Sequence, residues 1–278
     1  MIVLVTGSMG FIGRQAARKL ASQGHEVTGI DRNRDARDFF RDSQRRYDLV
    51  IHCAAVVGGR VLVETPLAHA ENLEIDAGLF RWAERMKPGR IVYVSSVAAY
   101  PRQLQFSPGQ LRETDTLLPA SPPDELYGWA KLTGEFLASR SSVPVSIPRP
   151  FTVYGEGQDQ IFPFANLMKQ VREHKDPITI WGSGRQTRDF IHVSDVVDAM
   201  LAMAEQDIDG PVNICTGRPV SLALLARMMA TAAGYTPEIR LFPDKPEGLP
   251  YRVGNPALLH TFCKPHITLE EGILRGLQ

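Results

Sequence analysis

The chain has 278 residues, of which 44% are hydrophobic and 22% are charged, as is ordinary for a soluble globular protein. Its 31 lysines and arginines balance its 31 aspartates and glutamates, which argues against a nucleic-acid-binding surface or an acidic tail. The length allows one large domain or two modest ones with a real hydrophobic core.

Features of the whole sequence indicate a cytoplasmic protein that acts on small molecules. The apolar runs, beginning with residues 2–5, are too short for a signal peptide or a membrane span. Cys53, Cys215 and Cys263 are far apart and have no metal-ligand spacing to the histidines. We therefore expect reduced, buried thiols, no metal, no membrane and no nucleic-acid partner.

A glycine-rich turn joins the first expected strand to the first expected helix. Gly7, Gly10 and Gly13 follow the apolar run directly, and an apolar helix pattern continues to Gly24. Glycines at this spacing let the backbone approach a pyrophosphate, and the helix N-terminus offers free N–H groups to it. Taken alone, a tight strand-to-helix turn explains the same pattern.

The second expected strand, residues 26–31, ends in a carboxylate. Dinucleotide-binding folds place an acid at this distance from the glycines, on the adenosine ribose. Asp31 favours NAD, because its charge would repel the 2′-phosphate of NADP. Arg32 and Arg34 suit that phosphate, so NADP stays open.

Strands and helices alternate through residue 148, and the pattern returns after residue 189. This predicts an α/β fold with a doubly wound parallel sheet and right-handed crossovers. We assign residues 1–160 and about 189–217 to a dinucleotide-binding Rossmann domain. Residues 161–188 and 218–278 form a smaller substrate-binding domain, whose tail from residue 219 mixes short helices with proline-rich loops. The expected elements are strands at 48–55, 91–96, 146–150, 189–192 and 212–215, with helices at 66–86 and 194–205.

A tyrosine and a lysine lie one turn apart on an expected helix at about 124–140. Tyr127 and Lys131 therefore share a face, and Asp124 is the expected N-cap. An ammonium beside a phenol stabilises the phenolate, so the tyrosine can exchange a proton near neutral pH. Such a pair also occurs by chance, but Ser95 and Ser96 end a strand whose carboxyl end lines the same crevice.

These segments together resemble the extended short-chain dehydrogenase/reductase family, in particular its nucleotide-sugar epimerases and reductases. The likeness covers almost the whole chain. The matching motifs are Thr6-Gly-Ser-Met-Gly-Phe-Ile-Gly13, His52-Cys-Ala-Ala55, Ser95-Ser-Val-Ala-Ala-Tyr100, Tyr127-Gly-Trp-Ala-Lys131, Arg149-Pro-Phe-Thr-Val-Tyr-Gly155 and Gly182-Ser-Gly-Arg-Gln-Thr-Arg-Asp-Phe190.

The resemblance implies roles for individual residues. Tyr127 would be the general acid/base, Lys131 would lower its pKa and hold the nicotinamide ribose, and Ser96 would bond the sugar hydroxyl, with Ser95 as the alternative. Asn72 matches a helix asparagine that is structural or holds water. The residues implied in cofactor binding are Gly7, Met9, Gly10, Phe11, Ile12, Gly13, Asp31, Arg32, Ala54, Ala55, Ser95, Tyr127, Lys131 and Pro150. The residues implied in substrate binding are Ser96, Tyr127, Thr152, Arg188 and Arg252, the two arginines on the diphosphate.

The sequence departs from the family pattern in three places. The segment between Asp31 and residue 48 is short, so a helix or a strand is reduced there and the adenine contact is not evident, with Asp35 as a candidate. Thr152 stands where many members have an asparagine. Ser96 is followed by Val97 and Ala98 and not by the acidic pair of the family's dehydratases, which disfavours dehydration.

We therefore predict an NAD-dependent epimerase that acts on a nucleotide-diphosphate sugar, at C4, through a keto-sugar intermediate. The alternatives are an NADPH-dependent 4-ketoreductase and a nicotinamide-binding regulator without chemistry. The regulator is disfavoured because it needs none of Ser96, Tyr127 and Lys131.

The resemblance also implies a homodimer. Family members generally pair through the two helices expected here at 66–86 and 124–140. The apolar residues that could supply this face are Leu67, Leu79, Phe80, Leu132, Phe136 and Leu137, although packing on the chain's own sheet explains some of them equally well.

Overall fold

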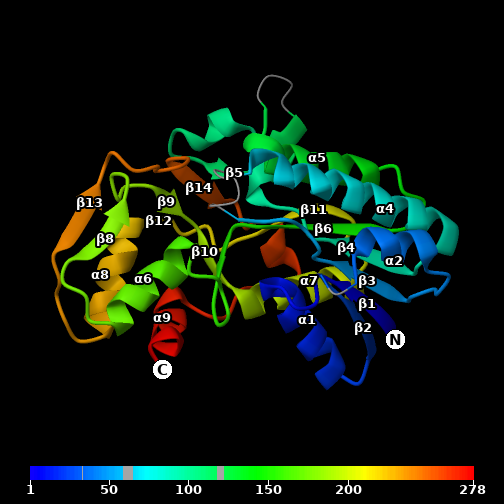
Figure 1. Ribbon diagram of the computed structural model, residues 1–278, viewed down its shortest axis with the longest axis horizontal. Helices are drawn as coiled ribbons and strands as arrows, with labels where there is room; N and C mark the ends of the chain where they lie inside the picture. Colours follow the sequence, from blue (N-terminus) through cyan, green and yellow to red (C-terminus); the bar gives the residue numbers. More distant parts are fainter. Residues whose placement is uncertain (33, 59–64, 118–121) are drawn as a thin grey trace.

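A six-stranded parallel sheet forms the centre of the molecule in the computed structural model, which describes residues 1–32, 34–58, 65–117 and 122–278 (Figure 1). The strand order is β11-β6-β4-β3-β1-β2, and every pairing in it is parallel. The strands are β1 (Ile2–Thr6), β2 (Glu26–Ile30), β3 (Leu49–His52), β4 (Arg90–Tyr93), β6 (Val145–Pro150) and β11 (Gly210–Ile214).

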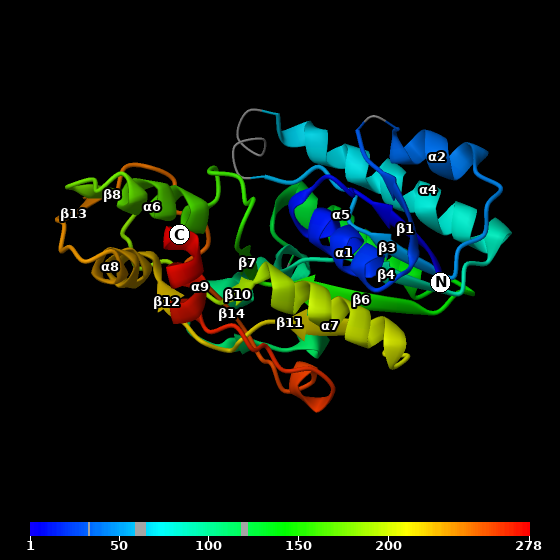
Figure 2. The ribbon, with the colours of Figure 1, turned by 90° about the horizontal axis from the view of Figure 1, so that it is seen from below.

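Helices cover both faces of this sheet. On one face, α1 (Phe11–Ser22) and α7 (Val193–Glu205) pack over Val3 and Val5 of β1. On the other, α2 (Ala36–Asp42), α4 (Glu71–Met86) and α5 (Glu125–Ala138) cover Leu4 (Figure 2). Because successive strand residues point to opposite faces, one short apolar strand serves both layers. The predicted doubly wound α/β fold is confirmed.

Two residues expected on the dimer face belong to this core instead. Leu79 and Phe80 of α4 are 0% and 6% exposed and pack with Trp82 and Ile91 under the sheet. For these two residues the alternative holds, because the apolar stripe of α4 covers the chain's own strands. Leu67 and Phe136 are exposed, whereas Leu132 and Leu137 are half-buried.

The short segment after Asp31 retains its helix and lacks a strand of its own. α2 leads directly into β3, which pairs with β1 and not with β2. Among the described residues between β2 and β3, no strand is present. In the sheet, β2 lies on one side of β1 and β3 lies on the other, so the strand order reverses at this point. Open α/β sheets bind ligands in the crevice at such a switch point, here between β1 and β3.

The remaining elements form a smaller lobe around a second apolar core, on the side of the molecule away from the N-terminus (Figure 1). Phe164, Leu167, Leu225, Met229 and Ile273 fill that core. The exact boundaries of the two domains stay a prediction. The lobe and its links to the sheet are made by α6 (Pro163–Arg172), α8 (Leu222–Ala232), α9 (Leu269–Leu277), β5 (Gln110–Leu111), β7 (Thr152–Tyr154), β8 (Ile178–Trp181), β9 (Thr187–Arg188), β10 (Phe190–His192), β12 (Val220–Ser221), β13 (Ile239–Phe242) and β14 (Tyr251–Gly254).

The structure differs from the expected elements in two segments. The tail contains strands β12, β13 and β14 as well as helices. These strands were not predicted, because runs of two to four residues are too short to show an alternating pattern. The helix expected at 66–86 begins as a 3₁₀ turn, η1 (Pro66–Ala70), before α4. Among the helices described, none is long and apolar enough to cross a membrane.

The three cysteines are free thiols. Cys215 is buried as expected, but Cys53 and Cys263 are half-buried. Burial raises the pKa of Cys53 to about 12, so this thiol is protonated at neutral pH despite the nearby ammonium of Lys131. None of these features indicates a reactive cysteine.

Candidate active site

The glycine turn brings the backbone of β1, α1 and the end of β3 into close contact. Gly7 has a φ of +66°, and a Cβ on Gly13 would lie 2.1 Å from the carbonyl oxygen of Gly7. The amide of Gly10 donates to Gly7 at 3.0 Å. α1 begins without a side-chain cap and without an acid in its first turn. Its N–H groups are therefore open to an anion, as a dinucleotide pyrophosphate requires.

Asp31 lies at the end of β2, facing this turn. Its carboxylate accepts hydrogen bonds from the amides of Met9 and Arg32, both at 2.8 Å. The side chain of Arg32 is exposed. Asp35, the candidate for the adenine contact, caps α2 through the amide of Arg37 and pairs with its guanidinium, which lowers the pKa of the Asp35 carboxyl.

The cofactor residues predicted on the other strands lie along the same edge of the sheet. Ala54 and Ala55 follow β3, and the amide of Ala54 donates to the hydroxyl of Thr6 at 3.1 Å. Pro150 is buried at the end of β6. Asn72 is structural: its amide group bonds both the N–H and the C=O of Val56, at 2.7 and 3.0 Å, and so fixes the backbone after β3.

The serine turn packs against the start of α5 through backbone contacts. The amide of Asp124 donates to Ala98 at 3.1 Å, and a Cβ on Gly128 would lie 2.2 Å from the same carbonyl oxygen. Ser96 begins this turn and its hydroxyl accepts from the amide of Ala98 at 3.1 Å. The contact brings the turn that carries Ser96 against the first turn of the tyrosine helix, α5.

Ser95 belongs to a buried polar network that the sequence analysis did not find. Its hydroxyl donates to Glu135 at 2.5 Å, and Glu135 forms an ion pair with Arg149 at 2.5 Å. Arg149 also donates to Tyr100, whose hydroxyl donates to Asn213. Both ions are buried and both have several partners, as a buried pair requires. The Ser95 hydroxyl is thus bonded to a side chain of α5.

Tyr127 and Lys131 share one face of α5, as predicted. Tyr127 is half-buried, and its ring packs against the His69 imidazole in a T-shaped arrangement at a centroid distance of 5.4 Å. The Lys131 side chain is 2% exposed, and its Nζ lies 4.9 Å from the centre of the Tyr93 ring. Within the described residues Lys131 has no carboxylate partner. A buried ammonium without an anion suits a site completed by a ligand.

The two predicted diphosphate arginines stand side by side in the smaller lobe. Arg188 of β9 and Arg252 of β14 are directly opposite in the strand register. Arg252 forms an ion pair with Asp124 and donates to Gln105 at 2.6 Å, whereas the guanidinium of Arg188 donates to the Thr187 carbonyl at 2.8 Å. Burial, with the charge of Arg252, lowers the pKa of Arg188 to about 9.

This arrangement corrects one expectation about the helix start. Asp124 occupies the N-cap position of α5, but its carboxylate makes no cap hydrogen bond and pairs with Arg252 instead.

Thr152, at the start of β7, is half-buried, and its amide donates to the carbonyl of Asp189 at 2.9 Å. Asp189 separates Arg188 from β10, so Thr152 and Arg188 lie on neighbouring segments.

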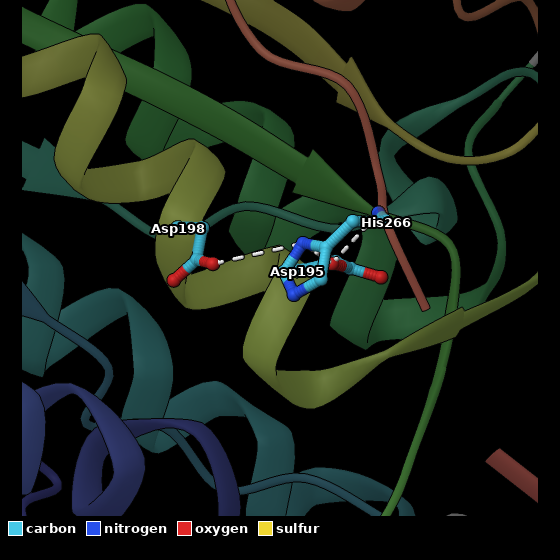
Figure 3. Close-up of side chains that lie close together, drawn as sticks. All are labelled: Asp195, Asp198 and His266. Carbon is cyan, nitrogen blue, oxygen red and sulfur yellow. Dashed lines mark hydrogen bonds and ion pairs between the residues drawn. The ribbon is translucent and has the colours of Figure 1, made fainter. Parts of the chain in front are cut away.

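Asp195 and Asp198 of α7 form a cluster with His266 of the C-terminal segment (Figure 3). Asp195 accepts from the amides of His266 and Ile267, both at 3.1 Å, and its carboxylate is 2.7 Å from the His266 ring. Asp198 is neutralised by Lys19. The Asp195 carboxylate therefore holds the C-terminal segment on α7, and Asp198 links α7 to α1 through Lys19.

The fold and the arrangement of these residues define a class of protein: a Rossmann-type α/β protein with a tyrosine–lysine pair on α5 and two arginines opposite each other in the outer lobe. The sequence pattern of the NAD dependent epimerase/dehydratase family matches residues 3–215. The chain belongs to this family, which confirms the resemblance noted in the sequence.

Known relatives match the chain along most of its length. It is 30% identical to dTDP-4-dehydro-6-deoxy-D-allose reductase of Streptomyces bikiniensis, covering 90% of this chain and 87% of that protein. It is 26% identical to the probable UDP-glucuronate 4-epimerase of Rhizobium meliloti, over 100% and 96% of the two chains. The crystal structure of UDP-glucose 4-epimerase from Thermus thermophilus with NAD shares the fold, with a TM-score of 0.83 at 24% identity over 100% and 98%.

The protein is thus an enzyme of the NAD(P)-dependent epimerase or ketoreductase type, and its relatives act on nucleotide sugars. The regulator without chemistry is set aside. The residues that carry the cofactor and the substrate stay predictions.

Proposed function

We propose that the protein is an NAD-dependent nucleotide-sugar epimerase that acts at C4 through a keto-sugar intermediate. The observation that carries this proposal is Asp31, whose carboxylate lies at the end of β2 and anchors the glycine turn through Met9. A carboxylate there suits the ribose hydroxyls of NAD and repels the phosphate of NADP. An epimerase keeps one NAD through many turnovers, whereas a reductase usually draws on NADPH.

The described residues fit a dinucleotide along the switch point of the sheet. The uncapped N-terminus of α1 would hold the pyrophosphate, Asp31 and Arg32 the adenosine ribose, and Lys131 the nicotinamide ribose. Ala54, Ala55, Ser95 and Pro150 line the strand ends beside it. When bound, the nicotinamide accepts a hydride from a sugar carbon and returns it.

Proton transfer falls to α5. Tyr127 takes the proton from the sugar 4-hydroxyl as the ketone forms and returns it when the ketone is reduced. The neighbouring ammonium of Lys131 favours the phenolate, and Ser96 holds the same sugar oxygen through its hydroxyl. Epimerisation requires the ketone to present its other face before the hydride returns, so these groups must act on both faces.

The outer lobe supplies an anchor far from the reacting carbon. Arg188, with Arg252 beside it, would bind the diphosphate, and Thr152 would contact the substrate between this site and the sugar. Two arginines directly opposite each other repel unless an anion lies between or above them. The binding energy of the diphosphate would orient the sugar toward Tyr127.

A ketoreductase is the second candidate, and one observation favours it: the 30% identical relative is a dTDP-4-dehydro-6-deoxy-D-allose reductase. The two activities use the same tyrosine and lysine. They differ in whether the nicotinamide leaves between turnovers.

The test uses purified protein with UDP-, dTDP- and GDP-hexoses and no added reductant. We expect two sugar nucleotides to interconvert, as resolved by anion-exchange chromatography, with no net change in absorbance at the nicotinamide band. Stoichiometric consumption of added NADPH with a 4-keto-sugar nucleotide, and no interconversion without it, would establish the reductase instead. NAD that copurifies with the protein would support the epimerase.

The homodimer stays part of the proposal with a revised face. Leu67 beside α4 and Trp129 and Phe136 on α5 are 79%, 50% and 58% exposed. Large apolar side chains on these two neighbouring elements are the kind of surface that a second copy covers.

A further inference from the structure

The side chain that holds Lys131 is an aromatic ring. Lys131 is almost fully buried, and its Nζ lies 4.9 Å from the centroid of Tyr93 on β4. An ammonium at this distance from a ring face is attracted by the negative charge of the π system. Within the described chain, no carboxylate lies in ion-pair range of Lys131. The Tyr93 ring is therefore the described partner of this cation.

A buried carboxylate lies on the hydroxyl side of the same ring. Tyr93 donates a short hydrogen bond of 2.6 Å to Asp76 of α4, and Asp76 is 1% exposed. The other carboxylate oxygen of Asp76 accepts from His52 Nε2 at 3.1 Å. Burial lowers the pKa of His52, so the ring is neutral and its Nδ1 accepts from Thr6 at 2.9 Å. A phenol that donates to a carboxylate has a more electron-rich ring, which strengthens its attraction for a cation.

The tyrosine–aspartate pair packs directly against α5 at Gly134, where any side chain would collide with it. A Cβ on Gly134 would lie 1.9 Å from the Tyr93 hydroxyl and 2.9 Å from the Asp76 carboxylate. Gly134 is one turn beyond Lys131 on α5. The glycine thus lets the tyrosine–aspartate pair press directly against the helix that carries Lys131.

We propose that Tyr93 and Asp76 are positioning residues for Lys131, holding its ammonium between Tyr127 and the nicotinamide ribose. This rests on the proposed roles of Tyr127 and Lys131. The ring fixes where the ammonium lies, and the Asp76 carboxylate supplies its negative charge through the ring, without an ion pair that would tie the lysine down. A direct carboxylate partner would compete with the phenolate and the ribose for the same N–H donors.

Other charged groups act on this region as well. Glu135 lies on α5 one turn past Lys131 but is engaged by Arg149 and Ser95. Both Glu135 and Tyr127 raise the pKa of Tyr93 further, after burial and Asp76, so Tyr93 stays a neutral donor. Asp76 is accordingly the negative charge that bonds to the ring beneath Lys131.

The test compares Asp76→Asn, Tyr93→Phe and Tyr93→Leu with the control Trp82→Phe. Asparagine keeps the shape of Asp76 and one acceptor oxygen but removes its charge, and phenylalanine keeps the ring that leucine removes. Trp82 is fully buried in the same apolar cluster, and its ring contacts are to other aromatics. The readouts are Kd for NADH by fluorescence, kcat, and the pH of half-maximal kcat on the acid side.

We expect Tyr93→Leu to weaken NADH binding and lower kcat on the order of tenfold, and Tyr93→Phe to recover only part of both, because it keeps the ring but loses the hydrogen bond to Asp76. Asp76→Asn should lower kcat and move the acid-side midpoint of kcat to higher pH, because a displaced ammonium no longer stabilises the anion that accepts the substrate proton. Loss of a negative charge by itself would move the midpoint the other way. The direction of that shift separates positioning from simple electrostatics.

The inference is overturned if the midpoint of Asp76→Asn stays in place or falls, or if neither Asp76→Asn nor Tyr93→Leu lowers kcat more than Trp82→Phe does. If Tyr93→Leu does not fold, the isosteric Asp76→Asn decides alone. Lys131→Met tests the proposed function separately. Unchanged NADH affinity and kcat in that variant would refute the role of Lys131 itself, whereas their loss with wild-type behaviour of Asp76→Asn would refute only the positioning.

Discussion

Replacing Arg188 by methionine should make the ligand-free protein more stable while weakening its grip on a diphosphate. Arg188 lies directly opposite Arg252 across β9 and β14, and the ion pair of Asp124 is with Arg252. Burial and Arg252 lower the pKa of Arg188 from 12.5 to about 9. A cation with a lowered folded-state pKa costs stability in full below that pKa, and the cost fades as pH rises toward the unfolded value.

The size of the effect follows from these values. A shift of this extent corresponds to at most about 5 kcal/mol at pH 7, and solvent around a half-buried side chain screens part of it. Methionine also gives up the hydrogen bond from Arg188 to the Thr187 carbonyl, worth about 1 kcal/mol. We therefore expect the free energy of unfolding to rise by roughly 1–3 kcal/mol.

The assay is urea unfolding at pH 7.5 in chloride buffer, followed by tryptophan fluorescence, beside calorimetric titration with UDP, dTDP and GDP. Diphosphate affinity should fall about tenfold or more, because a charge-assisted hydrogen bond is lost. Arg185→Met, at an exposed position three residues earlier, should change stability by less than about 0.5 kcal/mol. An Arg188→Met protein that is less stable than the wild type would refute the reasoning, since Arg188 would then have a compensating anion of its own.

Three further predictions concern the active site and the proposed dimer surface. Tyr127→Phe should retain NAD affinity and lose about 10²- to 10⁴-fold in kcat, and wild-type turnover would remove Tyr127 from the mechanism. Asp31→Ala should weaken NAD and improve NADP in paired Kd measurements, and a native preference for NADP would contradict this. Phe136→Glu should convert a dimer to monomers in sedimentation velocity while Leu274→Glu, exposed on α9, does not, and a wild-type monomer at micromolar concentration would oppose the dimer.

The sheet and its helices were predictable because their signals are local. A strand such as β1 is an uninterrupted apolar run, and the glycine turn follows it within a few residues. The tyrosine–lysine face depends only on helical spacing. Each of these features is written within one element, so no knowledge of distant contacts was needed.

The unpredicted features depend on distant contacts. The local sequence around Asp124 is typical of an N-cap. Its actual partner, Arg252, lies on β14, which is distant in the sequence. The stripe that contains Leu79 shows that α4 is amphipathic but not what covers it. One signal was available: Asp76 falls on the apolar stripe of α4, and a charged residue there indicates a buried partner.

The charge balance of the fold indicates where ligands belong. Two buried arginines, Arg149 and Arg90, have carboxylate partners in the chain, at 2.5 Å each. Lys131 in the sheet domain and Arg188 in the outer lobe are the described cations of the site that have none. We expect each cation to bind a different anion or oxygen-rich group. NAD and a nucleoside diphosphate should therefore raise the free energy of unfolding independently, by about 2.7 kcal/mol each when the ligand concentration is a hundred times its Kd. Because the two cations lie on separate elements, Lys131→Met should abolish the stabilisation by NAD and leave that by the diphosphate, while Arg188→Met should do the reverse.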